Sequence, residues 1–141
     1  MTSADWALQE AIHSALIGDG SVLKLLSGPH VYDDVPRGVG YPYVTFGQST
    51  LSDWSTMTDT GSEHVVSLHV WSQSAGRKET LAVMQALRAA LHDKALTVAG
   101  HQLINLRHEF SEARRDVDGE SFRGLVRLRG RTQPLAQVNP A

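Results

Sequence analysis

The sequence has 141 residues, with 13 basic and 15 acidic side chains and a formal net charge of −2. This length fits one domain with its own hydrophobic core. The absence of cysteine excludes disulfide scaffolds, thiolate metal sites and cysteine nucleophiles. No apolar run approaches the roughly 20 residues of a membrane span, and the first residues lack a signal-peptide pattern. Composition therefore predicts a soluble globular domain made in the cytoplasm, with no membrane contact.

The N-terminal residues predict a helix followed by a short helical turn. Ser3 is a suitable N-cap, and Gly18 marks the end of the helix. We expect Ser21 to cap the second turn. Between Ser3 and Gly18, apolar side chains recur every three or four residues and predict one buried stripe: Trp6, Leu8, Ile12, Ala15 and Leu16.

Three extended segments are expected next. Residues 31–35 form a short one, and residues 43–51 form a strand. The stretch from 49 to 62 is rich in Ser, Thr and Asp, which predicts strand ends joined by a long loop of a β-hairpin. Residues 63–71 are the clearest strand, because Val66, Leu68 and Val70 alternate with polar or larger side chains.

The second half predicts one helix and two further strands. Leu81, Met84, Leu87 and Leu91 have helical spacing within residues 77–93. A strand over residues 103–110 places Ile104, Leu106, His108 and Phe110 on one face, and residues 111–120 are expected to form a polar loop. Residues 122–131 form the last strand. The predicted fold is α+β, with both helices packed on one face of an antiparallel sheet. The expected domain spans residues 1–131, and residues 132–141 are expected to form a flexible tail.

No pattern of catalytic, cofactor-binding or metal-binding residues is found. The sequence lacks the His-Glu-x-x-His, Gly-x-Ser-x-Gly and phosphate-loop motifs. His64 and His69 are five residues apart on a strand and therefore point to opposite faces. The carboxylate pairs at 33–34 and 116–118 lie next to turns, and ordinary turn chemistry explains them better than a cation site. The sequence therefore predicts no enzyme, no cofactor and no metal.

Charge is divided unevenly along the chain. Residues 1–70 contain two basic and eight acidic side chains, whereas residues 71–141 contain eleven basic and seven acidic ones. The halves thus have net charges of −6 and +4. Seven arginines and no lysine lie between residues 107 and 131. Such a division can bind nucleic acid, or it can bring unlike surfaces of two copies together.

Four arginines share one face of the last strand, and we call them the arginine row: Arg123, Arg127, Arg129 and Arg131. A row of like charges destabilises a sheet, so counter-charges are expected nearby. Glu109, Glu112, Asp116, Asp118 and Glu120 are the candidates. Three interpretations remain open for the row: a solvated face, a subunit interface, or a contact with nucleic acid through the last strand. The lack of interleaved aromatic residues argues against the third.

The chain as a whole resembles the tail-completion, or tail-terminator, family of long-tailed bacteriophages and gene transfer agents. The resemblance covers roughly residues 4–131. It depends mainly on Tyr-Pro-Tyr-Val-Thr-Phe-Gly at 41–47 and on His-Val-Trp-Ser at 69–72 ahead of a helix. Further matches are Leu8-x-x-Ala11-Ile12, Leu23-x-x-Leu26 and Val31-Tyr-Asp-Asp-Val-Pro36. The arginine-rich last strand departs from the family pattern.

This resemblance implies a structural protein that assembles as a hexameric ring. Such a ring caps the tail tube, ends its polymerisation and joins it to the head connector or stopper, and DNA passes through its lumen. The implied location is the host cytoplasm during assembly and then the neck of the virion or phage-like particle.

The resemblance and the charge division suggest two sets of contact residues. A ring interface would bring the arginine row against acidic residues of the next protomer, for which Asp33 and Asp34 are the candidates. In the polar loop, Leu51, Trp54 and Met57 are the large apolar side chains, and they would contact a neighbouring ring. Alternatively, Trp54 folds back on its own sheet.

Overall fold

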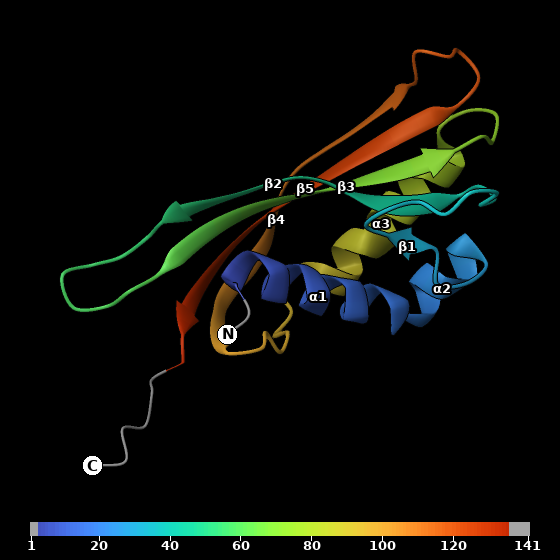
Figure 1. The fold of residues 1–141 in the computed structure, drawn as a ribbon. Helices are drawn as coiled ribbons and strands as arrows, with labels where there is room; N and C mark the ends of the chain where they lie inside the picture. The colour runs from blue at the N-terminus through green and yellow to red at the C-terminus, as the bar shows by residue number, and fades with distance from the viewer. Residues whose placement is uncertain (1–2, 136–141) are drawn as a thin grey trace.

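The computed structural model describes residues 3–135. Three helices lie on one face of a five-stranded sheet, and the other face is open (Figure 1). This arrangement confirms the predicted α+β class. The helices are α1 (Ala4–Ile17), α2 (Gly20–Leu26) and α3 (Lys78–Leu91). The strands are β1 (Val31–Tyr32), β2 (Tyr43–Asp53), β3 (Ser62–Ser72), β4 (His101–Arg115) and β5 (Phe122–Pro134).

The strand order is β1-β2-β3-β5-β4, with β4 and the short β1 at the two edges. The sheet is mixed rather than fully antiparallel, because β1 pairs parallel to β2. The other three pairings are antiparallel. Two hairpin loops lie at opposite ends of the sheet, residues 54–61 between β2 and β3 and residues 116–121 between β4 and β5 (Figure 1).

The core lies between the helices and the inner face of the sheet. Val66, Leu68 and Val70 of β3 are buried there, as the alternation predicted. On β5 the inner face includes Gly124, where an added Cβ would lie 2.6 Å from the Met84 sulfur of α3. The missing side chain lets α3 approach the strand closely. This close contact holds β5 with its arginine row facing outward.

The helices differ from prediction at their flanks. Trp6 and Leu81 are each 49% exposed. The buried face of α1 includes Ala7 instead of Trp6, and that of α3 includes Thr80 instead of Leu81. Asp19 rather than Ser21 caps α2, since its Oδ1 accepts a hydrogen bond from the Val22 amide at 3.0 Å. Ser3 holds the N-cap position of α1, but its side chain makes no capping bond.

Strand β4 departs most from the sequence-based prediction. It continues to Arg115 through residues expected to form a loop, and it contains two irregularities, at 103–105 and 108–110. Each shifts the side-chain alternation, as β-bulges do. Leu106 is consequently buried, whereas Ile104 and Phe110 are 40% and 42% exposed. The prediction that both share the buried face of Leu106 was therefore wrong.

Strand β5 extends to Pro134, three residues past the predicted domain end. Thr132 is 1% exposed and lies 2.8 Å from the Nε2 atom of the fully buried His64. The first residues of the expected tail therefore belong to the sheet. Leu135 follows the strand and donates its amide to the Gly100 carbonyl at 3.2 Å. The remaining residues of that tail, 136–141, lie outside the described residues.

Candidate interaction surface on the open sheet face

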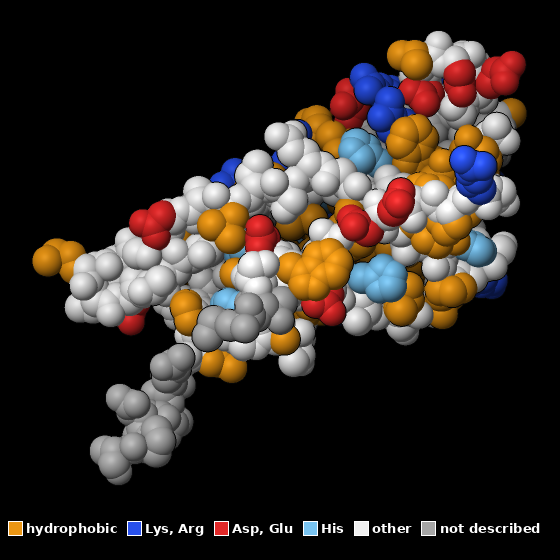
Figure 2. Space-filling model, viewed as in Figure 1, with side chains coloured by type: hydrophobic (Ala, Val, Ile, Leu, Met, Phe, Trp, Pro, Cys, Tyr) orange, Lys and Arg blue, Asp and Glu red, His pale blue; other side chains and the backbone are white. Residues whose placement is uncertain are grey.

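The open face of the sheet presents the arginine row. Across the β3–β5 pairing, Arg131 lies opposite Glu63, Arg127 opposite Ser67, and Arg123 opposite Trp71. The four arginines thus share the face away from the helices, as predicted. The space-filling view shows basic side chains beside acidic ones at the end of the molecule that carries the β4–β5 hairpin (Figure 2).

Two arginines of the row are neutralised by carboxylates of the same chain. Glu63 contacts both Arg129 and Arg131, and its Oε2 lies 3.1 Å from the Arg131 Nε. Glu109 completes the cluster, with its Oε1 2.8 Å from the Arg129 Nε. Hydrogen bonds from Arg131 and Arg129 hold the pKa of Glu63 below its usual range, and Glu109 raises the pKa of Arg129.

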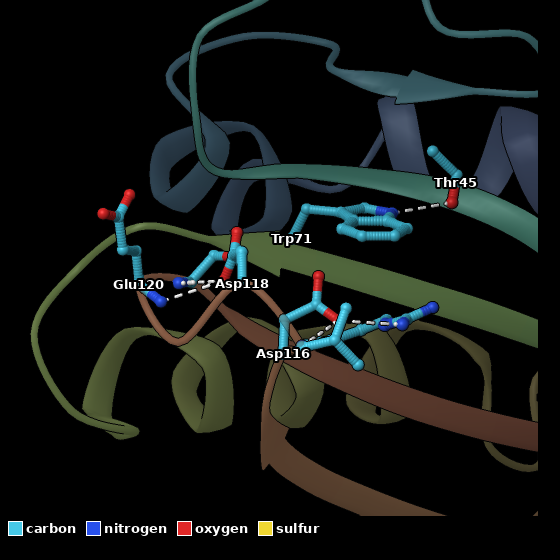
Figure 3. Close-up of polar contacts among 8 residues, drawn as sticks. Thr45, Trp71, Asp116, Asp118 and Glu120 are labelled. Carbon is cyan, nitrogen blue, oxygen red and sulfur yellow. Dashed lines mark hydrogen bonds and ion pairs between the residues drawn. The ribbon is translucent and has the colours of Figure 1, made fainter.

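Arg123 is held by a carboxylate and an aromatic ring. Its Nη2 lies 2.9 Å from Asp116 Oδ1, and its guanidinium carbon lies 4.6 Å from the Trp71 ring centroid. The Trp71 indole in turn donates to Thr45 Oγ1 at 3.0 Å (Figure 3). Asp118 accepts hydrogen bonds from the Glu120 amide and from Ser121. Both aspartates of the 116–118 pair thus have structural contacts, and the turn interpretation of the pair is confirmed.

Arg127 differs from the other three arginines. It makes no ion pair with any carboxylate of residues 3–135, and its guanidinium lies over the Phe110 ring at 5.2 Å. It borders a shallow groove of about 220 Å³ on the open face. Arg127 is therefore the arginine of the row that retains a free charge towards another molecule.

Asp33 and Asp34 lie at the other side of the sheet, directly after β1. Both are exposed, and Asp33 Oδ1 accepts a hydrogen bond from Gln9 Nε2 at 2.9 Å. Within one chain, β2 and β3 separate them from the arginine row. Asp33 also borders a groove of about 240 Å³ under the exposed Trp6 and the Phe46 ring. The sequence missed this groove because it predicted Trp6 to be buried.

The β2–β3 hairpin presents two exposed apolar residues. Met57 is fully exposed in the loop, and Leu51 is 46% exposed. Trp54 instead folds back: the Arg131 guanidinium lies 4.7 Å from its ring centroid, and its ring packs against Gly61. Trp54 therefore packs on its own sheet, as the alternative prediction for this residue stated.

Counter-charges were predicted in part. Glu109 and Asp116 pair with the row as expected, whereas Glu112, Asp118 and Glu120 make no ion pair within the described residues. Glu63 was missed, because its position opposite Arg131 depends on pairing between distant strands. Residues 3–135 contain no group of three potential metal ligands, and none of their helices is long and apolar enough to cross a membrane.

Comparison with solved structures places this fold among phage-like particles. A chain in the virion of a native gene transfer agent particle has a TM-score of 0.87 and 28% identity, covering 94% of this chain and 99% of that one. The gp17 protein of bacteriophage SPP1 has a TM-score of 0.60 and 20% identity, covering 96% and 94%, and at that identity it shows the fold alone. None of the curated protein sequences matches significantly.

The likeness to a virion chain, together with a match to a protein family, indicates a structural protein of phage tail assembly. A family model described as tail completion protein gp17 matches residues 10–133, almost the whole described domain. The chain belongs to the tail completion protein gp17 family. The family resemblance stated from the sequence is thus confirmed.

Proposed function

We propose that this protein is a tail terminator. Copies form a ring, hexameric by the family resemblance, which caps the tail tube, ends its polymerisation and joins it to the head connector or stopper. The observation that carries the proposal is the family match over residues 10–133. The near-complete coverage in both directions with a virion chain of a gene transfer agent supports incorporation into a particle. Assembly begins in the host cytoplasm, and DNA passes through the lumen.

The distribution of charge supports a ring interface between unlike surfaces. A closed ring needs a heterologous contact, in which one patch meets a different patch on the next copy. Asp33 and Asp34 lie at the β1 edge, and the arginine row lies beside the opposite edge. Arg127 is the member of the row with no carboxylate partner in residues 3–135. We propose that it contacts an acidic side chain of the adjacent protomer, with Asp33 and Asp34 as the candidates.

The exposed apolar side chains of the β2–β3 hairpin support a contact outside the ring. Met57 has no packing partner within the described residues, as its full exposure indicates. Leu51 is half-exposed on the same hairpin. We propose that the loop around Met57 contacts the tail tube or the connector, and Trp54 stabilises the hairpin from inside.

A nucleic-acid-binding role is less well supported. Three of the four arginines in the row already have carboxylate partners, which reduces the positive potential that a phosphate backbone needs. The assembly role also needs no catalytic group, so we propose that the protein is not an enzyme.

Negative-stain imaging and native mass spectrometry test the proposed function. The purified protein, alone and with polymerised tail tubes, should give rings and tubes capped at one end. Arg127→Glu should lower the ring fraction, whereas Arg88→Glu, the same charge reversal at an exposed position of α3, should not. Combining Arg127→Glu with Asp33→Lys and Asp34→Lys should restore rings in part. Uncapped tubes and a monomeric protein would contradict the proposed function, and normal rings from Arg127→Glu would contradict the role of Arg127.

A further inference from the structure

Two stretches of backbone at the sheet edges have no partner within residues 3–135. On one side, β1 covers only Val44 and Thr45 of β2, so the edge of Ser49–Asp53 is uncovered. All five side chains of that stretch are exposed, and it contains no lysine or proline to block pairing. The irregularity of β2 lies before it, between Phe46 and Ser49. Unprotected strand edges pair readily with other strands. This edge therefore has the properties of a pairing site.

The orientation of the free backbone groups of β2 follows from the hairpin bonds. Trp54 donates its amide to the Gly61 carbonyl at 2.9 Å. Hydrogen-bonded pairs alternate along an antiparallel ladder, so Ser52 and Thr50 also bond to β3. The backbone amides and carbonyls of Ser49, Leu51 and Asp53 therefore point outward, away from β3.

The other edge, β4, is free over only half its length. Its first half is covered, because Asp93 donates to the Leu106 carbonyl and the His92 ring accepts from the His108 amide. No such contact within residues 3–135 covers Ser111–Arg115. The Asp116 amide donates to the Ser121 carbonyl at 2.8 Å. By the same alternation, the amides of Ser111, Ala113 and Arg115 point outward, away from β5.

We propose that Ser49–Asp53 of one copy pairs antiparallel with Ser111–Arg115 of the next copy, so that the sheet continues from protomer to protomer. The pairing rests on the proposed ring and identifies its backbone interface. It places Asp33 and Asp34 of the neighbouring copy beyond the end of β4, so it is an alternative to the contact between these aspartates and Arg127. The strand directions suit it: β2, β3, β5 and β4 alternate in direction, so β2 and β4 run oppositely within one chain. A rotated copy placed beside β4 therefore presents its β2 in the antiparallel direction.

The side chains that meet in this pairing are compatible. Leu51 lies opposite the buried His64, and Ala113 lies opposite Gly124, so both are on the helix side of the sheet. A continuous sheet keeps its faces, and the pairing brings half-exposed Leu51 against the partly buried Ala113. Leu51 then belongs to the ring interface, and Met57 remains for a contact outside the ring. Arg114 and Arg115 make no ion pair within the described residues. In this register Ser49 faces Arg115 and Asp53 faces Ser111, so no like charges lie opposite each other.

The positions of the two free edges also suit a closed assembly. Ser49–Asp53 lies near the β2–β3 hairpin, and Ser111–Arg115 lies near the β4–β5 hairpin at the other end of the sheet (Figure 1). Pairing them staggers neighbouring copies along the strands. A staggered sheet closes into a barrel with tilted strands, as β-barrels do. In such a closed barrel the backbone groups of both edges find partners, and no open-ended assembly of sheets is needed.

Disulfide trapping tests the pairing directly, because the chain has no cysteine of its own. Facing residues of a hydrogen-bonded pair lie about 5.5 Å apart at Cα, within the disulfide range. Oxidised Leu51→Cys/Ala113→Cys should give a ladder of covalent oligomers on non-reducing gels. Leu51→Cys/Glu112→Cys, with the second cysteine on the other face, should give none. The pairing would be overturned if Leu51→Cys, combined with a cysteine at 111, 113 or 115, formed rings but gave no ladder of covalent oligomers.

A proline variant supplies an independent test. Leu51→Pro removes an outward amide and leaves the bonds to β3 intact, so the monomer should keep its circular dichroism and melting temperature. Its ring fraction should fall about tenfold or more, and that of Leu51→Ala should fall less. Hydrogen exchange at 49–53 and 111–115 should slow about tenfold on ring formation. Parent-like rings from Leu51→Pro, with no such protection, would overturn the pairing alone. A parent protein that forms no ring even with tail tubes would overturn the proposed function and the pairing together.

Discussion

The contact between Thr132 and His64 gives a sharp test of the described fold. It joins the end of β5 to β3, 2.8 Å apart, at a point where a flexible tail was expected. The His64 side chain is fully buried, and its Nδ1 atom has no partner among the described residues. Thr132→Val keeps the shape of the side chain and removes the hydroxyl. Both ring nitrogens of His64 would then be buried without a partner.

The size of the effect follows from that burial. Leaving a buried polar atom without its hydrogen bond costs about 1–3 kcal/mol, whereas replacing both partners by apolar groups is nearly neutral. Thr132→Val should therefore destabilise the protein by about 1–3 kcal/mol, which lowers the melting temperature by about 3–10 °C in a domain of this size. The double variant Thr132→Val/His64→Leu should recover part of that loss.

Urea and thermal unfolding followed by circular dichroism measure both quantities. Thr60→Val, at an exposed position in the hairpin loop, is the matched control and should change the free energy of unfolding by less than about 0.5 kcal/mol. If Thr132→Val were as mild as Thr60→Val, Thr132 would not be a buried partner of His64. The three residues at 132–134 would then behave as the tail that the sequence suggested.

Two further predictions concern acid and the hairpin loop. Burial lowers the pKa of His64, so the unfolded chain binds a proton more readily than the folded chain. Stability should therefore fall as the pH drops below about 6.5, the ordinary pKa of histidine. Urea melts at pH 7.5 and pH 5 measure this, and an equal pH dependence in His64→Leu would count against His64 as the cause. Met57→Ser should leave the free energy of unfolding unchanged within about 0.5 kcal/mol but weaken cosedimentation with tail tubes or the connector, because the Met57 side chain is fully exposed; parent-like cosedimentation with both would remove Met57 from the contact.

Local patterns predicted the elements whose partners are obvious in the sequence. The alternation along β3 and the spacing of Leu87 and Leu91 in α3 identified buried faces correctly. These signals are sufficient because each face is decided by side chains close together in the chain. The arginine row was found in the same way, since residues two apart in a strand always share a face.

The remaining features depend on pairing between distant strands. The bulges of β4 appear only against the register of β5, so the exposure of Ile104 and Phe110 could not be read from β4 alone. Glu63 became the counter-ion of Arg129 and Arg131 because β3 pairs with β5. The free edge of β2 likewise depends on β1 being only two residues long.

The charge division of the sequence is partly resolved inside one chain. Glu63, from the acidic half, neutralises arginines of the basic half, so less charge is available between copies than the values of −6 and +4 suggest. Exposed ion pairs contribute about 1 kcal/mol or less each. The charge of Arg127, which has no carboxylate partner within residues 3–135, therefore adds specificity to an interface but little cohesion. Backbone pairing at the β2 and β4 edges satisfies several hydrogen-bonding groups at once, which makes it the stronger source of cohesion in the proposed ring.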